Sequence, residues 1–490
     1  MISQSAEHFD VLIIGAGLSG IGAAYHVQTH LPNKRYAILE GRSAIGGTWD
    51  LFRYPGVRSD SDMYTLGYRF RPWLEAKAIA DAPSILRYIR DTAAHYNIEQ
   101  HIRFQHRLVR ASWSSADARW TLDVETMDAN TGAVRVVAFT CHVLYNCTGY
   151  YDYSHGYLPK FPGASLFRGP MVHPQAWPEQ LDYRDKRVVV IGSGATAVTL
   201  VPAMAQQAAH VIMLQRSPTY VVSQPSRDSF SRLARQWLPE GAAYAAVRWK
   251  NIALTILTYG ISQRYPQAMK NLLLARVRRE VGDHYDVATH FTPRYKPWDQ
   301  RMCLVPDSDL FLAIKSGKAS VVTGEIETFT EWGIRLTSGA ELSADIVVTA
   351  TGLNLRLLAG IEVIVDGQPM PIRDRVVYKG MMLSDIPNFV SAFGYTNASW
   401  TLKCDLTAEY TCRLIAHADK HGFRQFTPRQ RDPLMKTEPP LRFTSGYVQR
   451  AADRVPSQGL QTPWRVHQNY VSDLVALRYG RINDGVMEFV

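Results

Sequence analysis

A glycine-rich turn between an apolar run and a helical stretch occurs twice in this chain, and it constrains the fold more than any other feature. The first copy follows "FDVLII" at residues 9–14 and places Gly15, Gly17 and Gly20 in the pattern GxGxxG. The first glycine permits a tight turn, the second lets a pyrophosphate approach the backbone, and the third lets helix and strand pack closely. The N–H groups at the start of the helix bind phosphate. This pattern predicts a dinucleotide-binding unit.

The second copy lies in the middle of the chain. It reads "VVVIGSGATA" and places Gly192, Gly194 and Ala197 at the same spacing. Each copy is followed by candidate antiparallel strands and then by an apolar strand that ends in Thr-Gly, at Thr148-Gly149 and at Thr351-Gly352. We therefore predict an α/β fold with two Rossmann-like dinucleotide-binding domains.

The residue that follows the second strand differs between the two units. The first unit has Glu40 there, 20 residues after Gly20, and the second has Arg216 in "QRSPTY". A carboxylate accepts hydrogen bonds from ribose hydroxyls, whereas a guanidinium binds a 2′-phosphate. The first site then suits FAD or NAD, and the second suits NADP. The alternative is that both are solvated charges at strand ends.

The pattern divides the chain into segments. The predicted segments are an FAD-binding domain from residues 1–150 and 353–490, a linker at 151–186, an NADPH-binding domain at 187–352, and within it a helical insertion at 220–295. The insertion combines helical spacing with clustered cations. It is either a lid with a solvated basic face or a peripheral membrane contact.

Composition excludes several classes of protein. The five cysteines include no CxxC pair, which argues against a disulfide framework and against a zinc or other metal site. The net charge of +10 is scattered without a long basic run, so nucleic-acid binding is disfavoured. We expect a cytoplasmic protein, with membrane association as the open alternative; the sequence does not indicate an oligomeric state.

Two dinucleotide sites in one chain suggest hydride transfer from NADPH to a flavin. Disulfide reductases of this kind need a redox cysteine pair, which the chain lacks. A plain NADPH–flavin reductase, an oxygen-activating enzyme and a dinucleotide sensor without turnover remain open from the residues alone.

A resemblance to a known family narrows these alternatives. "GGTWDLFRYPGVRSD" resembles the flavin-contacting segment of the Baeyer–Villiger monooxygenases, which are class B flavoprotein monooxygenases. "FRGPMVHPQAWP" is similar to that family's fingerprint, FxGxxxHxxxW followed by Pro or Asp, between the two glycine-rich units. The resemblance covers almost the whole chain and is greatest to the ethionamide-activating branch of the family. The fingerprint positions are Phe167, Gly169, His173, Trp177 and Pro178.

The resemblance implies an NADPH- and O2-dependent oxygen insertion. A ketone would become an ester or lactone through a C4a-peroxyflavin, and sulfides or thioamides would be oxidised as well. The rival is a flavin-containing N/S-monooxygenase that acts through a hydroperoxyflavin. The family's catalytic arginine matches Arg301, and its partner carboxylate matches Asp60. Many members have Lys before that arginine, whereas this chain has Gln300, so an NADP contact of that lysine is not expected here.

The predicted cofactor contacts follow from the motifs and the resemblance together. For FAD they are Gly15, Ala16, Gly17, Ser19, Gly20, Glu40, Gly47, Thr48, Trp49 and Asp60. For NADP they are Gly192, Gly194, Thr196, Ala197, Arg216, Ser217 and Arg301.

Overall fold

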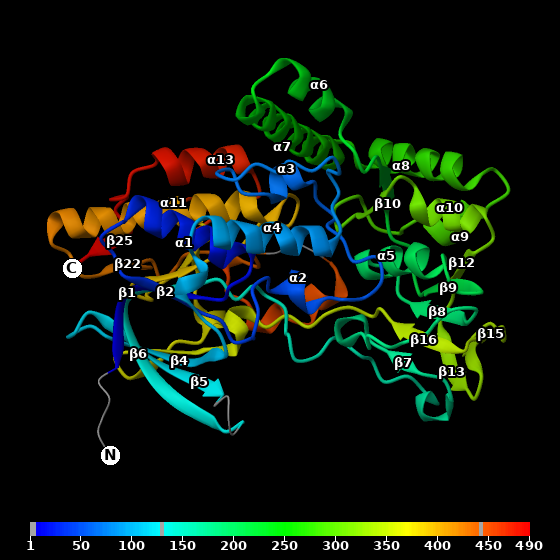
Figure 1. Ribbon diagram of the computed structural model, residues 1–490, viewed down its shortest axis with the longest axis horizontal. Helices are drawn as coiled ribbons and strands as arrows, with labels where there is room; N and C mark the ends of the chain where they lie inside the picture. Colours follow the sequence, from blue (N-terminus) through cyan, green and yellow to red (C-terminus); the bar gives the residue numbers. More distant parts are fainter. Residues whose placement is uncertain (1–5, 128–131, 441–443) are drawn as a thin grey trace.

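Two separate β-sheets, each covered by helices, organise the molecule (Figure 1). The computed structural model describes residues 6–127, 132–440 and 444–490. Strands from both ends of the chain build the larger sheet, and the middle of the chain builds the smaller one. This arrangement confirms the predicted fold class, an α/β protein with two Rossmann-like units.

The larger sheet has nine strands in the order β18-β17-β4-β5-β6-β1-β2-β3, with β21 also paired to β6. Strands β3, β2, β1, β6 and β21 run parallel, whereas β4, β5 and β6 form an antiparallel meander. The strands are β1 (Glu7–Ile14), β2 (Tyr36–Leu39), β3 (Ile102–Arg103), β4 (His106–Ser114), β5 (Arg119–Met127), β6 (Val134–Asn146), β17 (Glu362–Val365), β18 (Gln368–Pro369) and β21 (Phe389–Ser391).

Alternate residues of the central strand β1 enter different cores. Val11 and Ile13 face the helices, whereas Leu12 and Ile14 face the other layer, because side chains alternate along a strand. Full burial on both faces explains why the strand is a continuous apolar run. The helices on this part are α1 (Leu18–His30), α2 (Thr48–Leu51), α3 (Met63–Leu66), α4 (Ala82–His95), α11 (Trp400–His421), α12 (Gly446–Gln449) and α13 (Tyr470–Leu474).

Three short antiparallel strand pairs lie in the C-terminal part of the chain. They are β19 (Val377–Tyr378) with β20 (Met382–Leu383), β22 (Phe426–Pro428) with β25 (Met487–Phe489), and β23 (Thr437–Glu438) with β24 (Gln458–Gly459).

The smaller sheet is fully parallel, in the order β12-β9-β8-β16-β7. A helical layer lies on one face, and an antiparallel meander lies on the other. The sheet strands are β7 (Met171–Val172), β8 (Arg187–Ile191), β9 (His210–Gln215), β12 (Ala319–Thr323) and β16 (Ile346–Thr349). The covering elements are α5 (Ala195–Met204), α10 (Asp309–Lys315), β13 (Ile326–Thr330), β14 (Gly333–Leu336) and β15 (Glu341–Ser343).

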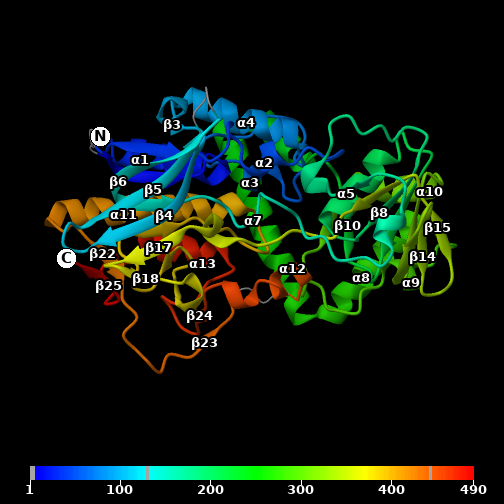
Figure 2. The ribbon, with the colours of Figure 1, turned by 90° about the horizontal axis from the view of Figure 1, so that it is seen from below.

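The segment 220–295 is mostly helical. It begins with a short strand that sequence reasoning missed, β10 (Val221–Gln224), which pairs with β11 (Cys303–Pro306). Helix α7 lies along the outer edge of the molecule, and seen from below it crosses the region where the two parts meet (Figures 1 and 2). No helix in the described ranges is both long and apolar enough to cross a bilayer. The helices are α6 (Ser229–Trp237), α7 (Glu240–Arg264), α8 (Pro266–Val281) and α9 (Val287–Phe291).

Candidate active site

The first glycine-rich turn joins β1 to α1 and leaves no room for side chains. Gly15 has φ +104, and a Cβ there would lie 2.8 Å from the carbonyl oxygen of Cys147. A Cβ on Gly20 would lie 1.8 Å from the carbonyl oxygen of Gly15. Gly17 is the N-cap of α1, so the free N–H groups of the first helical turn are next to the turn. This geometry fits a pyrophosphate cradle.

Glu40 follows β2, and its carboxylate is hydrogen-bonded to the glycine-rich turn. The N–H of Ala16 donates to Glu40 Oε2 at 2.7 Å, and the N–H of Arg42 donates to Oε1 at 2.8 Å. Burial raises the pKa of Glu40, and the two N–H donors and the nearby Arg42 charge oppose that shift. Each carboxylate oxygen keeps a lone pair for a ribose hydroxyl.

The GGTW segment lies against the same turn. Gly47 has φ +55, and a Cβ there would lie 3.2 Å from Gly17 Cα, so this close approach also needs a glycine. Thr48 Oγ1 lies 3.0 Å from the hydroxyl of Tyr153. On α1, Ser19 Oγ accepts a hydrogen bond of 2.8 Å from Trp400 Nε1. Trp49 packs partly buried against the helical core.

A cavity of about 520 Å³ connects the cradle to the second part of the molecule. Sequence-predicted residues from both glycine-rich units line it, together with the predicted catalytic pair. Gln300, the residue that replaces the expected lysine, is not among its lining residues. The predicted residues that line the cavity are Gly15, Gly17, Ser19, Glu40, Gly47, Thr48, Trp49, Asp60, Thr196 and Arg301.

Arg301 and Asp60 form a bidentate ion pair in this cavity. Arg301 Nε lies 2.7 Å from Asp60 Oδ2, and Nη2 donates to Oδ1 at 3.0 Å. The two residues are 241 positions apart in the chain. The Asp60 charge raises the pKa of Arg301 above its ordinary value, so the guanidinium stays charged at every working pH. The arginine side chain is 35% exposed, which leaves part of it available to a ligand.

Three tyrosines surround this arginine, and sequence reasoning missed them. The hydroxyls of Tyr150 and Tyr151 lie 2.8 Å apart, and burial raises the pKa of both. Burial also raises the pKa of Tyr447 to about 12. At neutral pH these three groups are neutral hydroxyls, so they add no charge beside the Arg301–Asp60 pair. For Tyr150 and Tyr151 the sequence signal was the run "YYDY" directly after Thr148-Gly149, and Tyr447 had none.

The second glycine-rich turn joins β8 to α5 and is more open. Gly192 has φ +137, and a Cβ there would lie 2.3 Å from the carbonyl oxygen of Ala350. A Cβ on Gly194 would meet no atom within 4 Å among the residues that the structure describes. Ala197 is fully buried on the inner side of α5, and the Thr196 side chain forms a hydrogen bond with Tyr54 at the cavity.

Arg216 and Ser217 follow β9 and are exposed. Ser193 Oγ in the glycine-rich turn donates to the Ser217 carbonyl at 3.1 Å, which holds the two segments together. Arg216 forms no ion pair with any residue in the described ranges, so its guanidinium is free to bind a phosphate. Neither residue lines the cavity.

The fingerprint segment forms the edge of the smaller sheet and does not line the cavity. His173 Nε2 donates to the carbonyl of Gly352 at 3.2 Å, and Nδ1 accepts from the N–H of Gln175 at 3.2 Å. His173 therefore ties the segment to the point where the chain leaves the smaller sheet. A Cβ on Gly169 would lie 2.3 Å from the Asp345 carbonyl oxygen. Phe167 and Trp177 pack partly buried on opposite layers of the sheet.

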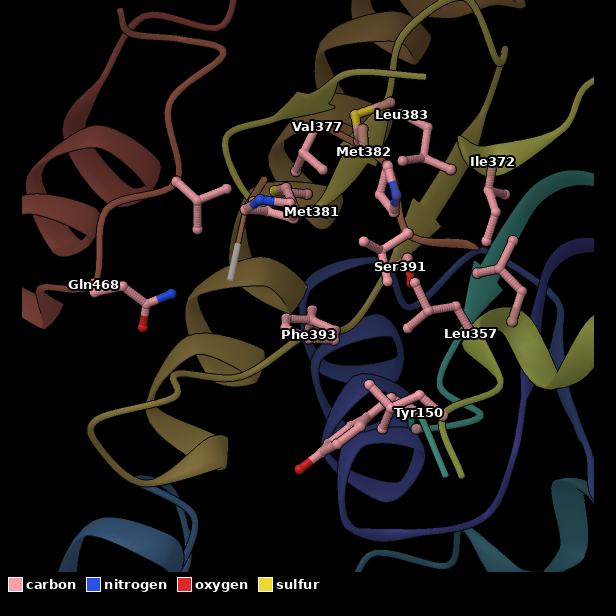
Figure 3. Close-up of a pocket in the computed structure, with 18 residues that line it drawn as sticks. Tyr150, Leu357, Ile372, Val377, Met381, Met382, Leu383, Ser391, Phe393 and Gln468 are labelled. Atoms are coloured by element: carbon pink, nitrogen blue, oxygen red, sulfur yellow. The ribbon is translucent and has the colours of Figure 1, made fainter. Parts of the chain in front are cut away.

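A second, smaller pocket of about 90 Å³ adjoins the cavity, because Gly149 and Tyr150 line both. Its walls are almost entirely apolar, and only Tyr150, Ser391 and Gln468 bring polar side chains (Figure 3). The apolar residues are Leu355, Leu357, Leu358, Ile372, Val377, Met381, Met382, Leu383, Phe393, Pro440, Val455, Pro456 and Val466.

Known proteins match this chain over nearly its full length. The family pattern described as flavin-binding monooxygenase-like matches residues 78–365, and an NAD(P)-binding Rossmann-like domain matches residues 13–74. The FAD-containing monooxygenase EthA of Mycobacterium tuberculosis (strain ATCC 25618 / H37Rv) is 53% identical over 99% of this chain and 98% of its own. The probable FAD-binding monooxygenase AlmA of Acinetobacter baylyi is 46% identical over 99% of this chain and 96% of its own.

Solved structures share the fold at lower identity. A steroid monooxygenase bound to NADP superposes with a TM-score of 0.75 at 22% identity, covering 99% of each chain. An open form of cyclohexanone monooxygenase superposes with a TM-score of 0.75 at 20% identity, covering 99% of this chain and 100% of its own. These likenesses extend over both sheets and the helical segment 220–295.

Proposed function

Because the chain belongs to the flavin-binding monooxygenase-like family, we propose that it is an NADPH- and O2-dependent Baeyer–Villiger monooxygenase. It would bind FAD in the first cradle and NADPH in the second. It would convert ketones to esters or lactones and would oxidise sulfides or thioamides. The observation that carries this proposal is the Arg301–Asp60 ion pair in the cavity where the two cradles meet.

The first cradle supports FAD binding. Its helix N-terminus offers N–H groups to the pyrophosphate, and Glu40 offers lone pairs to ribose hydroxyls. When bound, FAD supplies hydride acceptance from NADPH and the activation of O2. The relatives named as FAD-containing or FAD-binding monooxygenases support the same cofactor.

The second cradle supports NADPH rather than NADH. Arg216 is exposed, and its guanidinium suits the 2′-phosphate that distinguishes the two cofactors. A carboxylate at this position would repel that phosphate. Thr196 of this cradle lines the same cavity as the first cradle, so a nicotinamide held here would share that cavity with the flavin.

Arg301 supports oxygen transfer by stabilising negative charge without supplying a proton. A guanidinium does not act as an acid at working pH, so it stabilises negative charge that develops on oxygen and does not protonate that oxygen. Asp60 holds the guanidinium in one orientation through two hydrogen bonds. The tyrosine hydroxyls beside it stay protonated and add neutral hydrogen-bond donors.

The apolar pocket beside Tyr150 supports an apolar substrate. A carbonyl or sulfur group near Arg301 would place the hydrocarbon part of the molecule against the walls of the pocket (Figure 3). Burial of such a chain contributes about 0.8 kcal/mol for each methylene group.

A product analysis with one linear ketone and one thioether tests the proposal. NADPH consumption should depend on oxygen and should rise when either compound is added. The ketone should give an ester and the thioether a sulfoxide. A sulfoxide without any ester would favour the rival N/S-monooxygenase. NADPH and FAD binding without oxygen-dependent consumption would favour a dinucleotide sensor.

A further inference from the structure

Helices α6 and α7 concentrate exposed apolar side chains on the outside of the molecule. Of the 24 large apolar side chains that are exposed in the described ranges, nine lie between residues 230 and 265. Both helices stand at the edge of the molecule, away from the sheets (Figure 1). We call these nine residues the α6–α7 face: Phe230, Leu233, Trp237, Leu238, Trp249, Leu254, Leu257, Ile261 and Tyr265.

The spacing of these residues follows the helical period. On α6, Phe230, Leu233 and Trp237 recur at intervals of three and four, which puts them on one side of the helix. Leu254, Leu257 and Ile261 recur in the same way on α7. Packing of the inner sides against the protein accounts for buried residues such as Tyr244 and Val247. It does not account for an outer side where Trp237 is 81% exposed.

The segment around this face is strongly basic. Residues 220–295 contain eleven Lys or Arg and five Asp or Glu, so they carry +6 of the chain's net +10. Several of these cations are exposed on α6, α7 and α8. They are Arg232, Arg235, Arg264, Arg276, Arg278 and Arg279.

We propose that the α6–α7 face docks the enzyme onto the surface of an anionic lipid bilayer. Apolar side chains with tryptophan on one side of a helix, flanked by cations, are the features of helices that lie in the membrane interface. Each cation near an anionic surface raises the affinity by about fivefold. A second copy of the chain fits this face less well, because it would bring two segments of net positive charge together.

The same helix also contacts the active-site loop. Asn251 Nδ2 on α7 donates to Asp62 Oδ1 at 2.8 Å, two residues after the catalytic candidate Asp60. Arg248 Nη1 donates to the carbonyl oxygens of Tyr64 and Gly67 at 2.6 and 2.8 Å. Docking through the outer side of α7 therefore places the membrane next to the loop that holds Asp60.

Co-sedimentation of the purified flavin-bound enzyme with vesicles tests this proposal. One set of vesicles contains phosphatidylcholine alone, and the other contains equal amounts of phosphatidylcholine and phosphatidylglycerol. The enzyme should bind the anionic vesicles and should bind the neutral ones several-fold more weakly. The double variant Trp237→Ser, Leu257→Ser should lower binding to anionic vesicles by about tenfold or more, because less apolar surface enters the interface.

The matched control replaces exposed apolar residues elsewhere. Trp332 and Leu434 are 61% and 86% exposed and lie outside the face, so Trp332→Ser, Leu434→Ser should bind like the parent enzyme. Flavin content verifies that each variant folds. Absence of binding by the parent, or equal loss in both double variants, would overturn the proposal. So would a parent that is oligomeric without lipid and becomes monomeric only when Trp237 and Leu257 are replaced.

Discussion

The two glycine-rich turns have the same backbone plan but different surroundings. In the first, Ala16, Leu18 and Gly20 are buried, and the carboxylate at the end of the neighbouring strand is 7% exposed with both oxygens bonded to backbone N–H groups. In the second, Gly194 and the residue after it are exposed. Enclosure suits a cofactor that stays bound, and openness suits one that exchanges at each turnover.

The charged residue at the end of each second strand shows the same contrast. Glu40 is fixed by two N–H donors before any ligand arrives, whereas Arg216 extends from the surface without an ionic partner in the described ranges. Because Glu40 is already fixed, little side-chain entropy is lost when a ligand binds it. A mobile arginine side chain loses more entropy on binding. On the proposed assignment, the FAD site would be preorganised and the NADPH site adaptable.

The largest expected effect comes from adding one methyl group to each of the two glycine-rich turns. In Gly20→Ala the new Cβ would lie 1.8 Å from the backbone oxygen of Gly15, so the turn must distort. The variant should lose bound flavin and stability. In Gly194→Ala the methyl group meets open space. That variant should fold normally and keep its flavin, with NADPH binding about tenfold weaker because the pyrophosphate approaches less closely.

Flavin absorbance and thermal unfolding of the two alanine variants measure this difference. A Gly20→Ala protein that retains flavin and unfolds at the parent temperature would show that the first turn is not enclosed. Flavin loss in Gly194→Ala would show that the two sites do not act separately.

The next effect concerns the cation where the two sites meet. Arg301→Ala removes a fixed positive charge from the cavity, which typically costs about 10²–10³ in rate. The variant should keep its FAD and retain some oxidation of NADPH, but should release hydrogen peroxide in place of oxygenated product. Asp60→Ala should give a milder defect, because the arginine remains but loses its orientation.

Product yield per NADPH and peroxide formation, measured together, test this assignment. Ketone conversion by Arg301→Ala at a near-parent rate would show that another cation carries the role.

A smaller effect distinguishes the two dinucleotides at the second site. Losing a charge-assisted contact with phosphate removes roughly 1.5–3 kcal/mol. Arg216→Ala should therefore raise the apparent KM for NADPH by about ten- to a hundredfold and leave that for NADH unchanged. Steady-state assays with both nucleotides provide the comparison. Equal damage to both would mean that Arg216 supports the fold and not the phosphate.

The smallest effect is expected at the matching position of the first site. In Glu40→Gln the side chain keeps one oxygen that can accept a hydrogen bond. Its NH2 group replaces the other oxygen and faces one of the two backbone N–H groups, of Ala16 or Arg42. FAD affinity should fall about tenfold, which is about 1.4 kcal/mol. Fluorescence titration of the flavin-free protein measures this constant. NADPH affinity is the internal control and should not change; an effect on NADPH alone would reverse the assignment of the two sites.

The sequence predicted these two units well because their signals are local. An apolar strand, a glycine spacing and a helix lie within one short stretch, and the motif itself specifies the backbone. The positions of Glu40 and Arg216 followed from counting residues. Their surroundings did not, because burial of one and exposure of the other depend on segments far along the chain, such as Arg103 and His106, whose backbone groups hydrogen-bond to that of Glu40.

The pairing of Arg301 with Asp60 came from family resemblance and not from physical reasoning. Nothing local brings together two residues that are 241 positions apart. The tyrosines after β6 were missed for a related reason. Tyr150 is explained by its contacts with Tyr151, Trp400 and Arg301, and these contacts exist only after both sheets have formed.

Cofactor retention tests the contrast between the two sites most directly. The protein is incubated with FAD and NADP⁺, passed through a gel-filtration column and precipitated with acid, and both nucleotides are measured in the supernatant. The account predicts that flavin stays with the protein on the column, enters the supernatant after acid because it is not covalently attached, and that NADP⁺ is lost on the column. Retention of NADP⁺ with loss of flavin, or flavin that remains in the acid pellet, would contradict it.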